Sequence, residues 1–545
     1  MGVKQTFVQF CNETSLPGWG QAANARNIPL KIFWALLLLA AHLGVLLLCY
    51  SVTKDYLTST TLPIVKTTTG PISDIKFPAL VLCNVNQIQA SFMRKLGFYH
   101  DEMADQLFKS EFMWGRGADL TNEEVDKLQE LKEKLKLHYN WTEFNYATDF
   151  SKQKCSDMFQ YGYWQGNNHL FERSDAPDLD SVNFLSRNDR GTCCYFSIDR
   201  WFVDYVSESS TNSGLHFMLD LETHEYFDTS YGTSGIRFWL GDPFGKPMVS
   251  SAELNLSPGM EYLIEMSPSF LNISKDALQR FSPEQRDCYT EDEFVLKHFS
   301  DRYWFNYSMD NCEYNTAIEE TIQNCNCRPS FLFVADFMKL NEKVCMGKAK
   351  ACEREQLKLV LKGSSHLSFG EDGKARKCLP ACNQQHLVVK QSGQEYPMRK
   401  TFHKRKDICM TFRKILKLCQ VEERKITFEE TYGISMTCKE IEQANLSGVC
   451  LNDKFNGTLY PELSNALFTY ATDNLLRVKI FFKSPFYTLI TKESQIALGA
   501  FIGNMGGLLG MMLGLTAFGV VEMLSFACVF VYQLFIYQVF IKSKV

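Results

Sequence analysis

Two long apolar stretches, one near each end of the chain, constrain its fold more than any other feature. Residues 32–50 contain no charged side chain, and residues 494–541 contain a single one, Glu522. At about 1.5 Å per residue, the first stretch just crosses a hydrocarbon layer of roughly 30 Å. The second is too long for one straight span, and its glycines indicate a broken helix. We therefore predict membrane segments at residues 31–52 and 494–541, around a domain at residues 53–493.

A cleaved signal peptide is the alternative for the first stretch. Its apolar run exceeds the roughly 7–15 residues of a signal peptide and lacks a convincing small-residue cleavage site, so a retained membrane helix is favoured. Both ends of the chain carry net positive charge, from Lys4, Arg26, Lys31, Lys542 and Lys544. Positively charged flanks stay in the cytoplasm. We expect residues 1–30 and 542–545 to be cytoplasmic, in a multi-pass protein of the plasma membrane.

The cysteines and glycosylation sequons indicate that the central domain is extracellular. Of 19 cysteines, Cys11, Cys49 and Cys528 fall in the tails or the apolar stretches, which leaves 16 in between. An even number fits a disulfide-bonded domain in an oxidising compartment. Sequons for N-glycosylation occur at Asn140, Asn272, Asn306, Asn445 and Asn456. Another, at Asn255, is disfavoured by the proline that follows its serine.

The central domain shows a mixed α+β pattern. Residues 120–138 read as an amphipathic helix that begins with a capping box, because Thr121 precedes Glu124 by three positions. Short strands are predicted at residues 77–82, 215–221, 236–240 and 476–482. Cysteines are dense between residues 288 and 382, where disulfides should stabilise the fold more than a core does. A basic stretch, residues 399–417, is interpreted as a solvated face rather than a binding patch.

The second apolar stretch carries a face of glycines and one buried acid. Gly499, Gly503, Gly507, Gly510 and Gly514 recur every three or four residues, which places them on one side of a helix. Ordinary packing between two helices is the simpler explanation. Symmetry copies crowded around a pore axis are the alternative, because unwound backbone at membrane depth must be buried or line a wet cavity. An ionisable group such as Glu522 within this stretch favours the pore.

Five motifs occur in a fixed order along the chain. They are FPALVLCNVN at residues 77–86, Gly214-Leu215, the turn at 257–259, NCNCRP at 324–329 and the run GNMGGLLGMMLGLT at 503–516. Together they resemble the degenerin/epithelial sodium channel family, which includes acid-sensing channels and the FMRFamide peptide-gated branch, and the last run resembles its pore helix. The motifs cover more than 400 residues, and their agreement is very specific.

The resemblance implies roles for individual residues. Gly514, Leu515 and Thr516 match the G-x-S selectivity filter, with Thr in place of Ser, and the pore helix should be interrupted there. Gly503 falls at the position where bulky residues hold these channels open. The remaining residues implied in the pore or gate are Asn504, Gly507, Gly510 and Glu522. Pro17-Gly18 occupies the position of the family's gating motif His-Gly, so the glycine is kept and the histidine is replaced. Gln285 replaces a tryptophan that usually contacts the first span.

The resemblance also implies a disulfide pattern. In the thumb, residues 284–384, it pairs Cys288–Cys382, Cys312–Cys378, Cys325–Cys352 and Cys327–Cys345. A further rung of acid-sensing members is missing, because its positions hold Thr316 and Arg376. The other implied pairs are Cys83–Cys194 and Cys155–Cys193. Residues 398–460 do not match the family and are interpreted as an inserted subdomain, in which the pairing of Cys409, Cys419, Cys438 and Cys450 stays open.

The function that follows from the resemblance is a trimeric, sodium-preferring, amiloride-sensitive channel with palm, finger, thumb and β-ball parts. Its partners would be two further subunits, identical or not, the lipid bilayer, Na⁺ and an extracellular ligand, for which an amidated peptide is favoured. Protons, bile acids, mechanical load and constitutive opening are the alternative modes of gating. A cysteine-rich adhesion receptor is the alternative of another class. No enzyme motif is recognised, and no cofactor, metal or nucleic acid is expected.

Overall fold

The computed structural model divides into two compact units. Unit 1 comprises Met1–Ile64, Ile273–Arg286 and Thr491–Val545, and unit 2 comprises Val65–Asn272 and Asp287–Ile490. The structure describes residues 3–59, 61–64, 69–164, 168–172, 185–188, 191–196, 209–227, 232–241, 254–298, 307–329, 343–361, 367–370, 372–451, 453–457 and 460–542. Unit 1 therefore holds more than the two apolar stretches, because a segment near residue 280 joins it.

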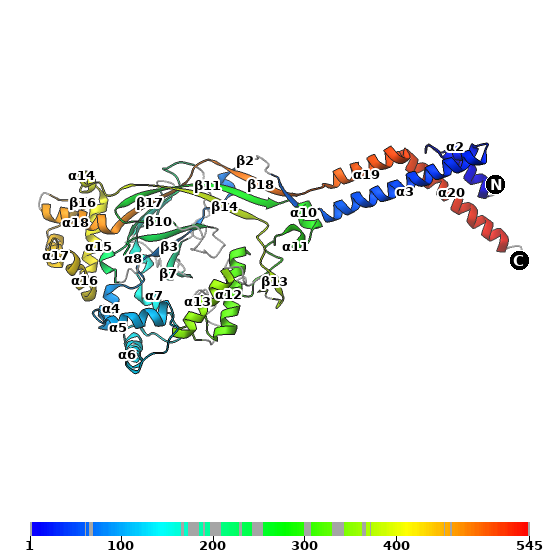
Figure 1. The fold of residues 1–545 in the computed structure, drawn as a ribbon. Coiled ribbons are helices and arrows are strands. Elements are labelled where there is room, and N and C mark those ends of the chain that lie inside the picture. Colours follow the sequence, from blue (N-terminus) through cyan, green and yellow to red (C-terminus); the bar gives the residue numbers. More distant parts are fainter. Residues whose placement is uncertain are drawn as a thin grey trace. The chain divides into compact units, whose positions relative to one another are not determined.

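The first apolar stretch forms one long helix, α3 (Ile28–Thr58), with a mean hydropathy of 2.5 in its most apolar window. It extends beyond residues 31–52 at both ends, since Asn27 starts it and polar residues continue it past residue 52. It follows two short helices, α1 (Val3–Glu13) and α2 (Trp19–Asn24). Figure 1 shows α3 beside α19 (Leu498–Leu513), where Met512 Cε lies 3.5 Å from the Cβ position of Gly44.

The second apolar stretch is bent. Helix α19 ends at Leu513, α20 (Ala517–Lys542) begins after three intervening residues, and the two axes differ by 71°. By length and composition, α3 could cross a membrane by itself, and the bent pair could do so if it acts as one span. The remaining elements of unit 1 are β1 (Thr61–Ile64), paired with the end of β18 (Phe486–Ser494), and the short helices α10 (Lys275–Arg280) and α11 (Pro283–Arg286).

Unit 2 is built on two packed sheets. The larger contains β14 (Gln384–Glu395), β11 (Met260–Ile273), β17 (Leu475–Phe482), β8 (Leu215–Asp220), β4 (Phe159–Trp164) and β5 (Asn168–Glu172), with β2 (Thr69–Pro71) paired to β18. The smaller has the order β10 (Leu254–Leu256), β9 (Ile236–Gly241), β3 (Ala79–Asn84), β7 (Gly191–Phe196) and β6 (Leu185–Asn188). Leu80, Phe217 and Ile480 meet in the core between them. Strands β3, β8, β9 and β17 confirm the four predicted strands.

The smaller sheet corrects two of the implied disulfides. The structure pairs Cys83 with Cys193 and Cys155 with Cys194, the reverse of the expectation. Neighbouring residues of a strand point to opposite faces of the sheet. Cys194 faces the main core with Cys155, whereas Cys193 lies on the other face with Cys83, 4.4 Å away between Cα atoms. Strand alternation therefore decides the pairing.

A helical layer of unit 2 forms around an aromatic cluster that includes Phe92, Phe108 and Trp141. Its elements are α4 (Ala90–Leu96), α5 (Glu102–Phe108), the π-helix η2 (Lys109–Met113), α6 (Asn122–Tyr139) and α7 (Thr148–Ser151), whereas α8 (Cys155–Met158) packs into the core between the two sheets. Helix α6 confirms the predicted helix, and both hydrogen bonds of the Thr121–Glu124 capping box are present. The 3₁₀ turn η4 (Thr223–Glu225) contacts α4, and another 3₁₀ turn, η1 (Ile72–Asp74), contributes Ile72 to the core between the sheets.

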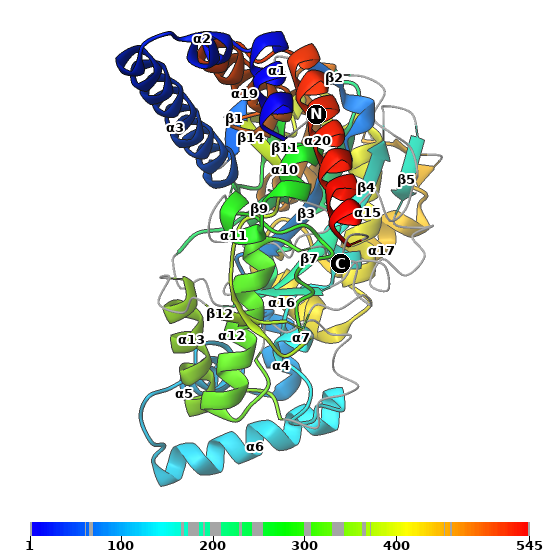
Figure 2. The same cartoon turned by 90° about the vertical axis from the view of Figure 1, so that its right-hand side faces the viewer.

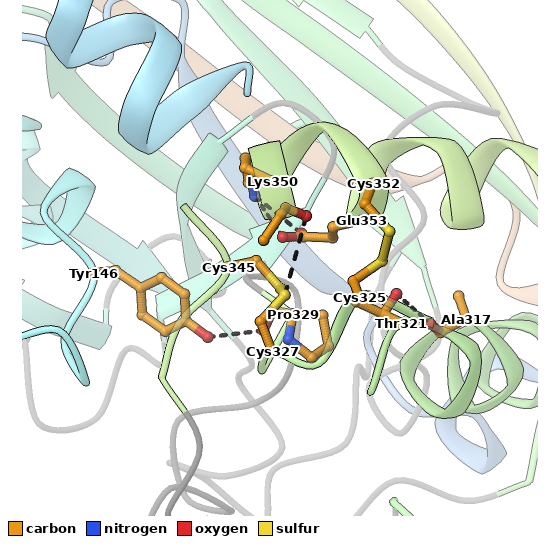
Figure 3. The surroundings of a disulfide bond; sticks show 11 residues. Tyr146, Ala317, Thr321, Cys325, Cys327, Pro329, Cys345, Lys350, Cys352 and Glu353 are labelled. Atoms are coloured by element: carbon orange, nitrogen blue, oxygen red, sulfur yellow. Dashed lines mark hydrogen bonds and ion pairs between the residues drawn. A yellow bond between two sulfur atoms is a disulfide. The ribbon is translucent and has the colours of Figure 1, made fainter. Parts of the chain in front are cut away.

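The cysteine-rich region contains the four disulfides expected for residues 284–384, each enclosing the next in sequence. Helices α12 (Met309–Cys325) and α13 (Gly347–Leu361) lie side by side (Figure 2). Figure 3 shows Cys325–Cys352 joining them, next to Cys327–Cys345 and the buried Lys350–Glu353 pair. Two short strands, β12 (Leu367–Phe369) and β13 (Ala375–Lys377), complete the region.

The unmatched segment near residues 398–460 folds into helices. They are α14 (Arg399–Phe402), α15 (Lys406–Leu418), α16 (Glu422–Tyr432) and α17 (Cys438–Leu446), followed by β15 (Cys450–Leu451), β16 (Lys454–Phe455) and α18 (Pro461–Asn474). The open pairing resolves as Cys409–Cys450 and Cys419–Cys438. The core of this segment includes Met218 and Leu475 of the larger sheet, so it packs on the sheet rather than standing apart.

One residue of the basic stretch departs from the predicted solvated face. Lys414 on α15 is only 2% exposed, and its Nζ lies 2.5 Å from Oε1 of the fully buried Glu222. Other members, such as Lys404 and Lys417, are exposed as predicted. The physical reason is the buried carboxylate, because a cation beside it offsets the cost of placing both charges out of water.

Candidate functional site

The break in the second apolar stretch is produced by its own sequence. Gly514 has φ +62°, a left-handed conformation that residues with a Cβ adopt at a cost, and it ends α19. Its N–H donates to the carbonyl of Gly510, and the N–H of Leu515 donates to that of Leu509. Thr516 then begins α20, because its hydroxyl oxygen accepts the N–H of Gly519 at 3.1 Å. The tripeptide therefore stops one helix and caps the next.

Between Gly499 and Gly510, the glycines of α19 have no packing role among the residues that the structure describes. A Cβ built on Gly499, Gly503, Gly506 or Gly507 meets no described atom within 4 Å beyond the nearby backbone of its own helix, and one on Gly510 meets only the Leu515 carbonyl. Asn504 is exposed beside them. Glycine in a helix is unfavourable by about 1 kcal/mol relative to alanine. Contacts among the described residues thus give no reason for small residues at positions 499–510.

Glu522 is hydrogen-bonded to the N-terminal segment. Its Oε2 accepts the Ser15 N–H at 3.1 Å and the Ser15 hydroxyl at 2.9 Å. An edge-to-face contact between Phe10 of α1 and Phe526 of α20, 4.9 Å between ring centroids, holds the same elements together. Sequence reasoning selected Glu522 and missed Ser15. The local signal is a hydroxyl residue two positions before the Pro-Gly pair.

The Pro17-Gly18 pair lies against the helix break. A Cβ on Gly514 would be 2.7 Å from Cδ of Pro17, so Pro17 contacts the first residue of the tripeptide. Gly18 has φ +90° and begins α2, and a Cβ there would lie 3.0 Å from a methyl group of Leu38 in α3. Both its backbone and its surroundings require glycine. The structure thus brings Pro17, Gly514 and Glu522 into one site.

A small apolar pocket opens on another side of this N-terminal segment. It has a volume of ≈ 490 Å³, and Cys11, Trp19 and His42 are among its lining residues. Burial raises the pKa of the Cys11 thiol. Cys11, Cys49 and Cys528 are outside the disulfides, in keeping with their places in the tails and apolar stretches.

Unit 2 contains a buried charged cluster around the turn after β8. Burial would raise the pKa of Glu222, but Lys414 and Arg424 outweigh it and lower that pKa to about 2. Arg424 also contacts Asp157 at 3.2 Å. This cluster joins α15 and α16 to the larger sheet.

Two neighbours of this cluster titrate in opposite senses. Burial raises the pKa of Glu225 to about 7, despite the hydrogen bond from the Ser91 N–H. Burial lowers the pKa of His224 to about 4, despite the attraction of Glu222. The Glu225 contribution to stability is present below its ordinary pKa of 4.5 and is lost as the pH rises to about 7. The His224 contribution is present above 6.5 and is lost as the pH falls to about 4.

The predicted glycosylation sites are accessible to different degrees. Asn140, Asn445 and Asn456 are exposed, and Asn272 on β11 is half-buried. Asn306 lies outside the described residues. The disfavoured Asn255 is also exposed.

Comparison with known proteins matches most of the chain. A family model described as amiloride-sensitive sodium channel covers residues 10–526, which include Pro17, Gly514 and Glu522. The sodium channel protein Nach of Drosophila ananassae is 21% identical over 375 residues, 64% of this chain and 66% of that protein. Acid-sensing ion channel 1C of Danio rerio is 22% identical over 465 residues, 83% and 70% of the two chains. Acid-sensing ion channel 1 of Gallus gallus is 20% identical over 534 residues, 95% and 82%.

Proposed function

Because this chain belongs to the amiloride-sensitive sodium channel family, we propose that it forms a sodium-preferring, amiloride-sensitive cation channel of the plasma membrane. Members of the family are ion channels and not enzymes. The observation that carries the proposal is the break at residues 514–516, next to glycines at positions 499–510 that packing among the described residues does not require. An adhesion receptor would need neither feature.

The proposed assembly is a trimer in which α3 and the bent pair α19–α20 are the two spans of each subunit. Both termini are cytoplasmic, and the region between the spans forms the palm, finger, thumb and β-ball. The positive ends, the sequons and the eight disulfides support this topology. Epitope tags at either terminus should bind antibody only after permeabilisation. A C-terminal tag that is accessible on intact cells would contradict the topology.

Permeation is proposed to occur at the tripeptide. The last carbonyl groups of a helix have no partner inside that helix, and at the end of α19 those near Gly514 can replace part of the water shell of a cation. The hydroxyl oxygen of Thr516 has two lone pairs and uses one for Gly519, so the other can contribute. Three copies around an axis would form the constriction.

Glu522 is proposed to raise the local concentration of cations. Both hydrogen bonds from Ser15 go to Oε2, and no described residue donates to Oε1. Three such carboxylates would form a negative ring eight residues beyond Gly514. Their effect is electrostatic, so it should weaken as the ionic strength rises.

Gating is proposed to follow the binding of an extracellular amidated peptide, as in the FMRFamide-gated branch. A ligand opens the channel by its differential affinity for the open and closed states. Protons are the second candidate, because the pKa of Glu225 lies near neutrality in a buried cluster. Relatives named as acid-sensing channels support the same candidate.

Whole-cell recording from cells that express the chain tests the proposed function. Synthetic FMRFamide and acidic steps should each be applied with Na⁺ outside, then with a large impermeant cation, and with amiloride. The proposal predicts an inward current that requires Na⁺ and is blocked by amiloride. Surface protein that carries no such current, even in Gly503→Cys modified with a bulky thiol reagent, would contradict it.

A further inference from the structure

The segment between β11 and Cys288 contacts both apolar helices of unit 1. The contact is not made at position 285, where the family resemblance places a tryptophan. Gln285 accepts the N–H of Ser282 at 3.1 Å and so caps its own turn. The contact with α3 comes instead from Arg280, the last residue of α10. The Arg280 side chain is 13% exposed.

The Arg280 guanidinium bridges two backbone carbonyls from distant parts of the sequence. Its Nη2 donates to the carbonyl of Tyr56 at 2.7 Å, and its Nη1 donates to the carbonyl of Ile496 at 2.8 Å. Tyr56 lies in the last turn of α3, whose carbonyls lack partners within the helix and attract cations. Ile496 lies two residues before the start of α19. One planar fork therefore joins the end of one apolar helix to the beginning of the other.

Aromatic stacking extends this bridge into α19. The Arg280 guanidinium carbon lies 3.7 Å from the centroid of the Tyr56 ring, and the Tyr56 ring stacks on Phe501, with 4.3 Å between centroids and 25° between planes. Asp276, one turn earlier on α10, accepts the Ser494 hydroxyl at 2.6 Å. Phe501 is two residues from Gly503 on the glycine face.

We propose that Arg280 is the positioning residue through which α10 controls the outer ends of α3 and α19, and hence the opening of the pore. This inference rests on the proposed function. Helix α10 follows directly from the long strand β11, and the chain continues from it to the first thumb cysteine. A movement that reaches α10 along the chain from either side is thus transmitted to both apolar helices by one side chain. Arginine is needed because lysine cannot serve both carbonyls with a planar fork.

The rate at which a thiol reagent modifies Gly503→Cys tests this role. Loss of the bridge frees the outer end of α19, so Arg280→Lys in the Gly503→Cys parent should accelerate modification about tenfold, the equivalent of one hydrogen bond to a charged group. Tyr56→Phe keeps both the ring and the carbonyl and should react at the parental rate. Tyr56→Ala loses the stacking and should also react faster.

Lys275→Gln is the matched control, because it removes an exposed positive charge from the same helix. It should react at the parental rate, and no variant should change the reversal potential. An unchanged rate in Arg280→Lys, or an equal acceleration in Lys275→Gln, would overturn the proposal. A reversal potential altered by Arg280→Lys would also overturn it, because the effect would then lie at the filter.

Failure of the proposed function gives a different result. In that case the modified Gly503→Cys parent carries no current at all. The rate is then measured chemically, as labelling of surface protein by a biotin maleimide. Acceleration by Arg280→Lys still supports the bridge, and an unchanged rate still refutes it.

Discussion

Replacing Gly514 with alanine should disturb the break in two separable ways. Alanine in the left-handed conformation of this residue costs about 1–2 kcal/mol. Its Cβ would also lie 2.7 and 2.9 Å from Cδ and Cγ of Pro17, closer than real Cβ contacts. The proline ring is rigid, so the whole loop must move, and overpacking of this kind costs about 1–3 kcal/mol.

The expected result is a displaced N-terminal loop and a distorted constriction. Gly514→Ala should lose the hydrogen bonds from Ser15 to Glu522 and change the ratio of sodium to potassium permeability. Adding Pro17→Ala removes the clashing ring atoms, so it should restore part of the current while the backbone cost of about 1–2 kcal/mol remains. Pro17→Ala alone is the control.

The assay is the reversal potential with Na⁺ outside and K⁺ inside, together with the current per surface channel. Two outcomes would refute the reasoning. One is wild-type selectivity in Gly514→Ala. The other is a double variant with Pro17→Ala that is no better than the single one, since the contact between Pro17 and Gly514 would then be irrelevant.

Three further predictions concern the pore and the charged cluster. Thr516→Ala should shift the reversal potential, whereas Glu522→Gln, which keeps an acceptor for its hydrogen bonds, should chiefly lower unitary conductance, most strongly at low ionic strength. Lys414→Met leaves a buried carboxylate without its nearest cation and should destabilise the full chain by about 3 kcal/mol, measured as a lower melting temperature in detergent. Between pH 7 and 4.5 the opposed contributions of Glu225 and His224 should nearly cancel. Glu225→Gln should therefore make stability fall on acidification, and an unchanged pH profile would contradict this.

The sequence predicted most of the fold because its signals are local or ordered along the chain. The nested disulfides between Cys288 and Cys382 are implied by a family resemblance that rests on motifs in a fixed order, and the capping box at Thr121 needs only four residues. Cys193 and Cys194 are different, because spacing cannot tell neighbours apart. Their partners depend on which face of β7 each one occupies, and that depends on the register with β3.

The candidate site was predicted in part for the same reason. The signals that stop and start a helix at Gly514 and Thr516 are local. The contact between Ser15 and Glu522 joins residues 507 positions apart, and no periodicity encodes it. Lys414 resembles any exposed helical lysine until the buried Glu222 is placed beside it.

Arg280 was missed because its partners are backbone carbonyls. Any residue could supply those carbonyls, so the sequences around Tyr56 and Ile496 carry no mark of the contact. The loss of the expected tryptophan at position 285 indicated only that another contact was needed.

The most direct test of a cation channel built around residues 514–516 forces the pore open without knowledge of its stimulus. Gly503→Cys is modified with a bulky thiol reagent on the cell surface, and the amiloride-blocked current is recorded with Na⁺ outside and K⁺ inside. Wild-type chain treated with the same reagent controls for reaction at Cys11, Cys49 and Cys528. We predict a steady inward current that reverses at a positive potential. Surface protein that is fully modified and carries no current would contradict the account.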